Sequence, residues 1–166
     1  MPGVLIAGIG NIFLGDDAFG VEVAQRLLRR ELPAEVKVID YGIRGFDLAF
    51  ALMDDYDAVI LVDATARGGE PGTLYTIEPD LASLNDLGPA EFDAHGLTPT
   101  NVLAMVKGLG GEPRRVLIVG CEPSPCGETE ERMGLSAPVE AAVEEALPMI
   151  QSLAVRLLVK QTIAAT

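Results

Sequence analysis

The stretch Val4-Leu-Ile-Ala-Gly-Ile-Gly-Asn11 decides the fold, together with the residues that follow it to Gly20. Its apolar run Val4–Ala7 is continuous rather than alternating, which is typical of a strand buried on both faces. From Phe19 to Arg30, apolar residues recur at helical spacing and predict an amphipathic helix. Between them, Asp16 and Asp17 occupy positions where acids cap a helix. A buried strand, a glycine-rich loop and a helix in this order predict an α/β fold.

The rest of the chain repeats this alternation. Strands are expected over 36–40, 58–63 and 115–120, the last two of them buried, and a less buried or edge strand over 73–77 because its polarity alternates. Helices are expected over 46–53, 97–109 and 136–159, whereas 78–92 is expected to be loop or weakly helical and 121–133 to be a loop. Strands that alternate with helices predict a mostly parallel sheet covered by helices on both faces. No linker or repeat divides the chain, so residues 1–166 are expected to form one domain.

Composition narrows the function. The chain has 12 Lys and Arg residues against 25 Asp and Glu, a net charge of −13 that excludes an electrostatic footprint for nucleic acid or anionic membrane. No signal peptide or membrane span is apparent, and Cys121 and Cys126 are too few for a disulfide framework. A cytoplasmic location is therefore expected. Cys121 is expected to pack as a small apolar residue.

Chemistry is expected where the buried strands end. Asp17 follows the expected strand over 4–7, and Asp63 ends the expected strand over 58–63. The only histidine, His95, lies in a loop before a helix. Carboxyl ends of parallel strands share one edge of a sheet, so these three side chains are expected to converge there. Two carboxylates and an imidazole suit a borderline divalent metal such as zinc or nickel. Residues expected to line or support the same cleft are Gly10, Asn11, Asp16, Asp40 and Gly42.

Other interpretations of these residues stay open. Asp16 and Asp17 can serve only as a helix cap, and an isolated histidine in a loop is more often an ordinary surface residue. Gly8 and Gly10 after a strand, with Asp40 closing the next strand, also fit part of a dinucleotide fingerprint. That fingerprint lacks its third glycine, and two acids at the helix start disfavour a phosphate there.

The order of the motifs resembles one known family. The block from Gly8 to Gly20 is similar to the opening signature of the [NiFe]-hydrogenase maturation endopeptidases. Later blocks resemble that family in the same order, and His95 falls where the family places its histidine. These blocks are Ile39–Gly42 with Gly45, Leu61–Ala64, Pro71–Thr73, Gly120–Pro123 and Gly134–Ser136 with Val139–Ala141.

This resemblance implies a three-layer α/β/α sandwich with a twisted, mostly parallel five-stranded sheet. It implies an endopeptidase that removes the C-terminal extension from the precursor of a [NiFe]-hydrogenase large subunit after nickel insertion. Asp17, Asp63 and His95 are then the metal-binding and catalytic residues. The nickel belongs to the substrate precursor, and no tightly held cofactor is expected. A non-catalytic nickel checkpoint or chaperone for the precursor, and a Rossmann-like nucleotide-binding protein, are the alternatives.

Overall fold

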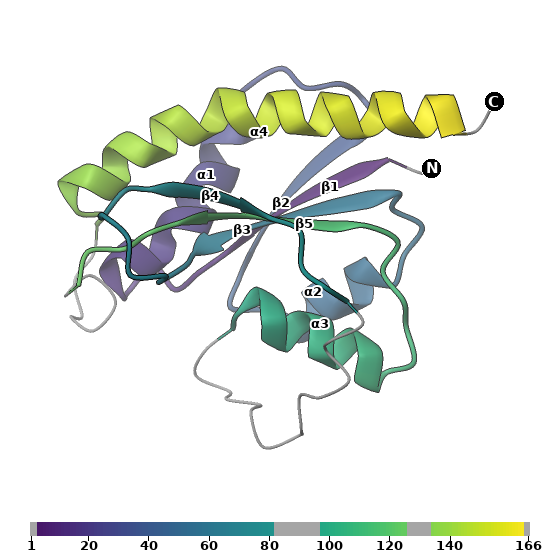
Figure 1. Ribbon diagram of the computed structural model, residues 1–166, viewed down its shortest axis with the longest axis horizontal. Coiled ribbons are helices and arrows are strands. Elements are labelled where there is room, and N and C mark those ends of the chain that lie inside the picture. The colour runs from purple at the N-terminus through teal and green to yellow at the C-terminus, as the bar shows by residue number, and fades with distance from the viewer. Residues whose placement is uncertain (1–2, 82–96, 126–133, 165–166) are drawn as a thin grey trace.

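The computed structural model describes residues 3–81, 97–125 and 134–164, with side chains up to residue 160 (Figure 1). Its elements alternate between strand and helix, as the sequence predicts. In chain order they are β1 (Val4–Ile9), the 3-10 turn η1 (Gly15–Ala18), α1 (Phe19–Leu27), β2 (Val36–Gly42), α2 (Gly45–Leu52), β3 (Ala58–Ala64), β4 (Leu74–Ile77), α3 (Pro99–Gly108), β5 (Val116–Cys121) and α4 (Ala137–Ala164).

The five strands form one sheet in the order β2-β1-β3-β5-β4. β1 pairs in parallel with both β2 and β3, and β3 pairs in parallel with β5. Among the strands of the described residues, only β4 is antiparallel, and it pairs with β5 at the edge of the sheet. The predicted mostly parallel, five-stranded sheet and its edge strand are thus confirmed.

Each central strand buries alternate residues in two separate cores, because successive side chains point to opposite faces of a sheet. In β1, Val4 and Ile6 pack with α1 and α4, whereas Leu5, Ala7 and Ile9 pack with α2 and α3. Figure 1 shows α1 and α4 on one side of the sheet and α2 and α3 on the other. The chain therefore has the predicted three-layer α/β/α architecture, and its strands are continuously apolar because both faces are covered.

A glycine lets α1 approach the sheet closely. A Cβ atom at Gly20 would collide with the carbonyl oxygens of Val62 in β3 and Ile9 in β1. This close packing draws the start of α1, and the turn η1 before it, against the carboxyl ends of β1 and β3. η1 itself packs against β3.

One expected local feature is wrong. α1 begins after Ala18, and no side chain caps it. Asp16 and Asp17 lie instead within η1, and their carboxylates accept hydrogen bonds from other parts of the chain. These carboxylates therefore accept hydrogen bonds from the preceding loop and from distant segments instead of from the N–H groups at the start of α1.

The remaining elements differ from the prediction mainly at their ends. β1 continues through Gly8 to Ile9, and α4 extends beyond residue 159 with Pro148 inside it. Pro99 occupies the first turn of α3, where the Thr98 hydroxyl accepts a hydrogen bond from the Asn101 N–H at 3.1 Å. Among the described residues, no helix combines the length and apolar character needed to cross a membrane.

Candidate active site

The candidate site lies where the order of the strands reverses. From β1 the chain crosses to β2 on one side and later returns to β3 on the other. Loops that leave neighbouring strands in opposite directions open a crevice at the carboxyl ends of the strands, and ligands bind there in folds of this type. η1 follows β1, and Asp63 is the penultimate residue of β3. Two of the three predicted principal residues, Asp17 and Asp63, therefore lie at this edge.

Asp17 is half-buried in the turn η1. Its Oδ2 accepts a hydrogen bond from the Asn11 N–H at 2.8 Å, and a Cβ at Gly10 would collide with the Asp17 carbonyl oxygen. Burial raises the pKa of Asp17 above its ordinary value, and the hydrogen bond from Asn11 lowers it in part. A carboxyl group with a raised pKa exchanges a proton more readily near neutral pH, which suits a general base or acid.

Asp63 is almost fully buried, with 3% of its surface exposed. Its Oδ1 accepts a hydrogen bond from the Ala64 N–H at 2.8 Å. Because side chains alternate along β3, Asp63 points to the same face as Val59 and Leu61, the face that α2 and α3 cover. A carboxylate this deeply placed at the end of a central strand is held rigidly by the sheet.

Asp16 has a different environment from its neighbour. It is 1% exposed, and its carboxylate accepts hydrogen bonds from the Ser136 N–H at 2.7 Å, the Ser136 hydroxyl at 2.8 Å and the Ser124 N–H at 3.0 Å. Ser124 follows β5, and Ser136 immediately precedes α4. Asp16 thus fastens η1 to both of these segments, and this bonding fixes the turn that carries Asp17.

The loop after β2 lies beside the loop after β1. The Gly10 N–H donates to the Gly42 carbonyl at 3.0 Å, and Gly42 adopts a positive φ of 55°. Asp40 accepts hydrogen bonds from the Gly42 N–H at 2.9 Å and from the Gln25 amide of α1 at 3.2 Å. Gly10, Asp40 and Gly42, three of the residues expected to line or support the cleft, are therefore joined by hydrogen bonds at this edge.

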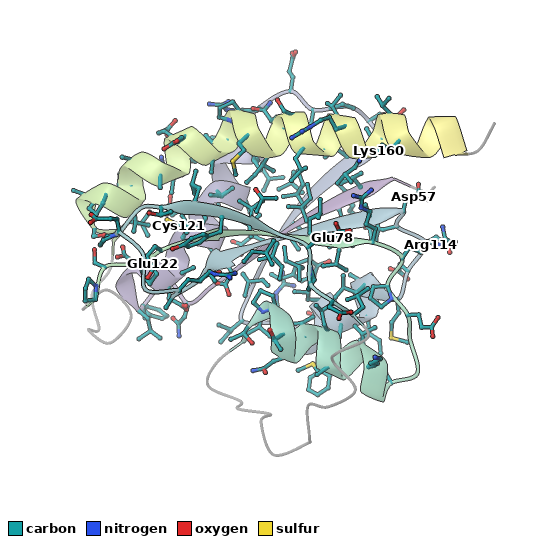
Figure 2. All side chains as sticks on the ribbon, in the orientation of Figure 1. Asp57, Glu78, Arg114, Cys121, Glu122 and Lys160 are labelled. Carbon is teal, nitrogen blue, oxygen red and sulfur yellow. The ribbon has the colours of Figure 1, made fainter. Side chains whose placement is uncertain are left out.

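Sequence reasoning missed Glu122. This residue is 5% exposed at the end of β5, where Figure 2 labels it beside Cys121. Its carboxylate accepts hydrogen bonds from the Arg67 N–H at 2.8 Å, the Gly68 N–H at 3.0 Å and the Tyr75 hydroxyl at 2.8 Å. Although burial acts to raise the pKa of Glu122, these hydrogen bonds outweigh it and lower the pKa.

Glu122 therefore fixes the loop that follows Asp63. The sequence did carry a signal for it, because an acid directly after a buried strand is the same pattern that singled out Asp63. Cys121 is fully buried, as expected, and burial raises the pKa of its thiol to about 12. It packs in the core that α1 and α4 share.

Two predicted positions, His95 and Cys126, lie outside the described residues. Within the described ranges, no three His, Cys, Asp or Glu side chains are grouped so as to hold a metal ion. A cavity of about 520 Å³ lies at the opposite edge of the sheet, lined in part by Gly3, Glu35 and Tyr56, and contains none of the predicted site residues. The acids at the strand ends therefore remain the candidate site.

Comparisons with known proteins identify the family of the chain. The family model of the HycI hydrogenase maturation proteases matches residues 21–153. The chain belongs to the hydrogenase maturation protease family. It is 35% identical over 148 residues to a putative hydrogenase maturation protease of Methanocaldococcus jannaschii, covering 89% of this chain and 93% of that one. It is 31% identical over 149 residues to the hydrogenase 2 maturation protease of Escherichia coli, covering 89% and 87%.

A solved structure gives the same result. The hydrogenase maturating endopeptidase HybD of Escherichia coli superposes with a TM-score of 0.71 at 29% identity and covers 91% of each chain. The predicted family is therefore confirmed. As a hydrogenase maturation protease this protein is a peptidase, and its family implies a hydrogenase large subunit as substrate.

Proposed function

We propose that this hydrogenase maturation protease removes the C-terminal extension of a [NiFe]-hydrogenase large-subunit precursor that has already received its nickel. One observation carries the proposal: two carboxylates from separate segments, Asp17 and Asp63, lie at the carboxyl ends of the neighbouring strands β1 and β3. Acids from neighbouring parallel strands at the switch point form a site on which a cation and a peptide can meet.

Asp17, Asp63 and His95 engage the nickel that the precursor carries and so position the scissile peptide bond. Carboxylate oxygen and imidazole nitrogen are ligands that nickel accepts. Water then attacks the scissile carbonyl carbon, the C–N bond breaks, and the leaving amine takes up a proton. The water is activated either by a carboxylate that accepts its proton or by the substrate nickel.

The surrounding residues act on these groups indirectly. Asp16 holds η1, Asn11 donates to Asp17, and Asp40 with Gly42 and Gly10 shapes the adjoining loops. These contacts join parts of the chain to one another, so we assign these residues a supporting role in the cleft.

The test mixes the purified protein with nickel-loaded precursor, or with nickel-free precursor, and records the intact mass of the precursor. We expect the mass to fall by one short C-terminal fragment only when nickel is present. Asp17→Asn, Asp63→Asn and His95→Gln should each abolish the loss. The matched control is Asp55→Asn, because Asp55 is 91% exposed and does not belong to the candidate site.

The other outcomes separate the alternatives. Nickel-dependent binding without any loss of mass would support a checkpoint protein. Equal cleavage of nickel-loaded and nickel-free precursor would contradict recognition of the nickel. A dinucleotide that raises the melting temperature, with no binding of precursor, would favour a nucleotide site. Normal cleavage by all three site variants would contradict the catalytic and nickel-binding role of Asp17, Asp63 and His95.

A further inference from the structure

Large apolar side chains gather on the outer face of α2. Phe46, Phe50 and Met53 are spaced four and three residues apart, so they share one face of the helix, and Ile43 precedes them at its start. Their exposed fractions are 60%, 56%, 40% and 65% in that order. We call these four residues the apolar stripe. The inner face of α2 is buried through Leu48, Ala49 and Leu52.

The loop after β1 adds two more exposed apolar side chains. Ile12 is 43% exposed and Phe13 60% exposed, and their loop is joined to the start of the stripe by the hydrogen bond between Gly10 and Gly42. Phe19 is the sole buried phenylalanine in the described ranges, although phenylalanine is among the residues most often found inside proteins. This face of the molecule therefore departs from ordinary surface composition.

Such clusters mark binding surfaces. Contiguous exposed apolar patches larger than a few hundred Å² are uncommon on monomeric proteins, and the centres of protein interfaces are enriched in phenylalanine and methionine and depleted in charge. The stripe lies on a chain with a net charge of −13, and the charged pair beside it, Arg44 and Asp47, is joined at 3.5 Å. An uncharged surface on so acidic a protein favours a partner that is apolar rather than basic.

The stripe begins at the candidate active site. Ile43 directly follows Gly42, and Phe13 lies two residues from Asn11, whose N–H binds the Asp17 carboxylate. Asp63 points to the face of the sheet that α2 and α3 cover. A protein whose tail enters the site therefore meets the apolar stripe with the surface next to that tail.

The available area favours a transient partner over a second copy of this chain. A fully buried aromatic side chain covers about 150–250 Å², and we take the lower part of this range for isoleucine and methionine. At exposures of 40–65%, the six side chains offer roughly 600 Å². A stable interface buries about 800 Å² on each partner. The stripe together with Ile12 and Phe13 is thus sufficient to orient a substrate that must leave after cleavage, and small for a lasting dimer.

We propose that the apolar stripe, with Ile12 and Phe13, is the docking surface for an apolar patch on the folded body of the protein substrate. This inference rests on the proposed function, because it requires that the substrate be a folded protein cut at its tail. The stripe then supplies binding energy remote from the scissile bond, and the site residues supply the chemistry.

The test compares the double variant Phe46→Gln/Phe50→Gln with wild type. Precursor binding is measured by titration, and KM and kcat are measured by cleavage. We expect the dissociation constant and KM to rise about tenfold or more, as for loss of aromatic interface anchors, with kcat at saturation within about twofold. The matched control is Val155→Gln/Val159→Gln, because these residues are 43% and 53% exposed on α4, across the sheet from α2 (Figure 1). The control should behave as wild type.

Unchanged binding and KM in the stripe variant would overturn the inference. A wild-type dimer that the stripe variant converts to monomer, again with unchanged KM, would overturn it in favour of self-association. Because binding is measured apart from cleavage, the two proposals fail separately. A wild type that binds without cutting contradicts the proposed function, whereas equal binding by wild type and stripe variant contradicts the docking surface.

Discussion

Replacing Asp16 by alanine removes a buried carboxylate that accepts three hydrogen bonds between 2.7 and 3.0 Å. The Ser136 hydroxyl keeps a partner, because it also lies 3.0 Å from the Ser124 hydroxyl. The main-chain N–H groups of Ser124 and Ser136 lose their acceptor. A buried donor without an acceptor costs about 1–3 kcal/mol, so two cost roughly 2–6 kcal/mol before any water enters. We therefore expect Asp16→Ala to lower the free energy of unfolding by about 3 kcal/mol.

Urea unfolding measures this change, provided that the m-value is the same for wild type and variant. For a chain of this length, about 3 kcal/mol corresponds to a fall in Tm of about 6–12 °C. Asp16→Asn keeps one acceptor oxygen and should lose about half as much. Ser136→Ala loses the hydroxyl contacts to Asp16 and Ser124 but keeps the bond from its N–H to Asp16, and it should cost about 1 kcal/mol. Asp47→Ala is the control, because its exposed ion pair with Arg44 is worth less than about 1 kcal/mol.

The expected order of destabilisation is Asp16→Ala, then Asp16→Asn, then Ser136→Ala, then Asp47→Ala. If Asp16→Ala costs no more than the Asp47→Ala control, Asp16 does not hold the three segments together. In that case the orientation of η1, and with it the placement of Asp17, must depend on other contacts.

A Cβ at Gly20 collides with the Val62 carbonyl, so Gly20→Ala should lower the free energy of unfolding by about 1–3 kcal/mol. The control Gly108→Ala lies in open space at the end of α3 and should raise the free energy of unfolding by up to about 1 kcal/mol. Equal Tm values for the two variants would refute the packing argument. Glu122→Gln should lower Tm at pH 7. The folded-state pKa of Glu122 is depressed, so its stabilisation is present above the ordinary value of 4.5 and is lost as the pH falls through the folded pKa. The difference in Tm should therefore shrink in acid, and a constant difference would contradict the ionic role. Burial raises the pKa of the Cys121 thiol to about 12, so iodoacetamide at pH 8 should modify Cys121 in urea but not in the native protein, as peptide mapping by mass will show.

Local patterns were sufficient to predict most of the elements. Continuous apolar runs predicted β1, β3 and β5, and alternating polarity predicted the edge strand β4. The errors lie at ends where the signal is weak, as in β1, whose last residues include a glycine with no side chain to bury. The edge that gathers Asp17 and Asp63 was also predictable, because parallel strands present their carboxyl ends together.

The roles of the individual acids were not predictable in this way. Asp16 and Asp17 are identical neighbours in the sequence, yet one is bonded to residues 108 and 120 positions away and the other to the loop before it. The role of Glu122 in holding the loop after β3 follows only from the hydrogen bonds that this loop donates to it. The exposure of Phe46 and Phe50 likewise follows from which face of α2 the sheet and α3 cover.

The sequence by itself determined the layers, because burial on one or two faces imposes a period that the apolar residues must follow. Only the tertiary structure decided which carboxylate is fully bonded inside the protein and which stands half-buried at the crevice. It also decided that an apolar helix face is left uncovered. These properties depend on partners that are distant along the chain and meet only when the loops of β1, β3 and β5 pack against one another.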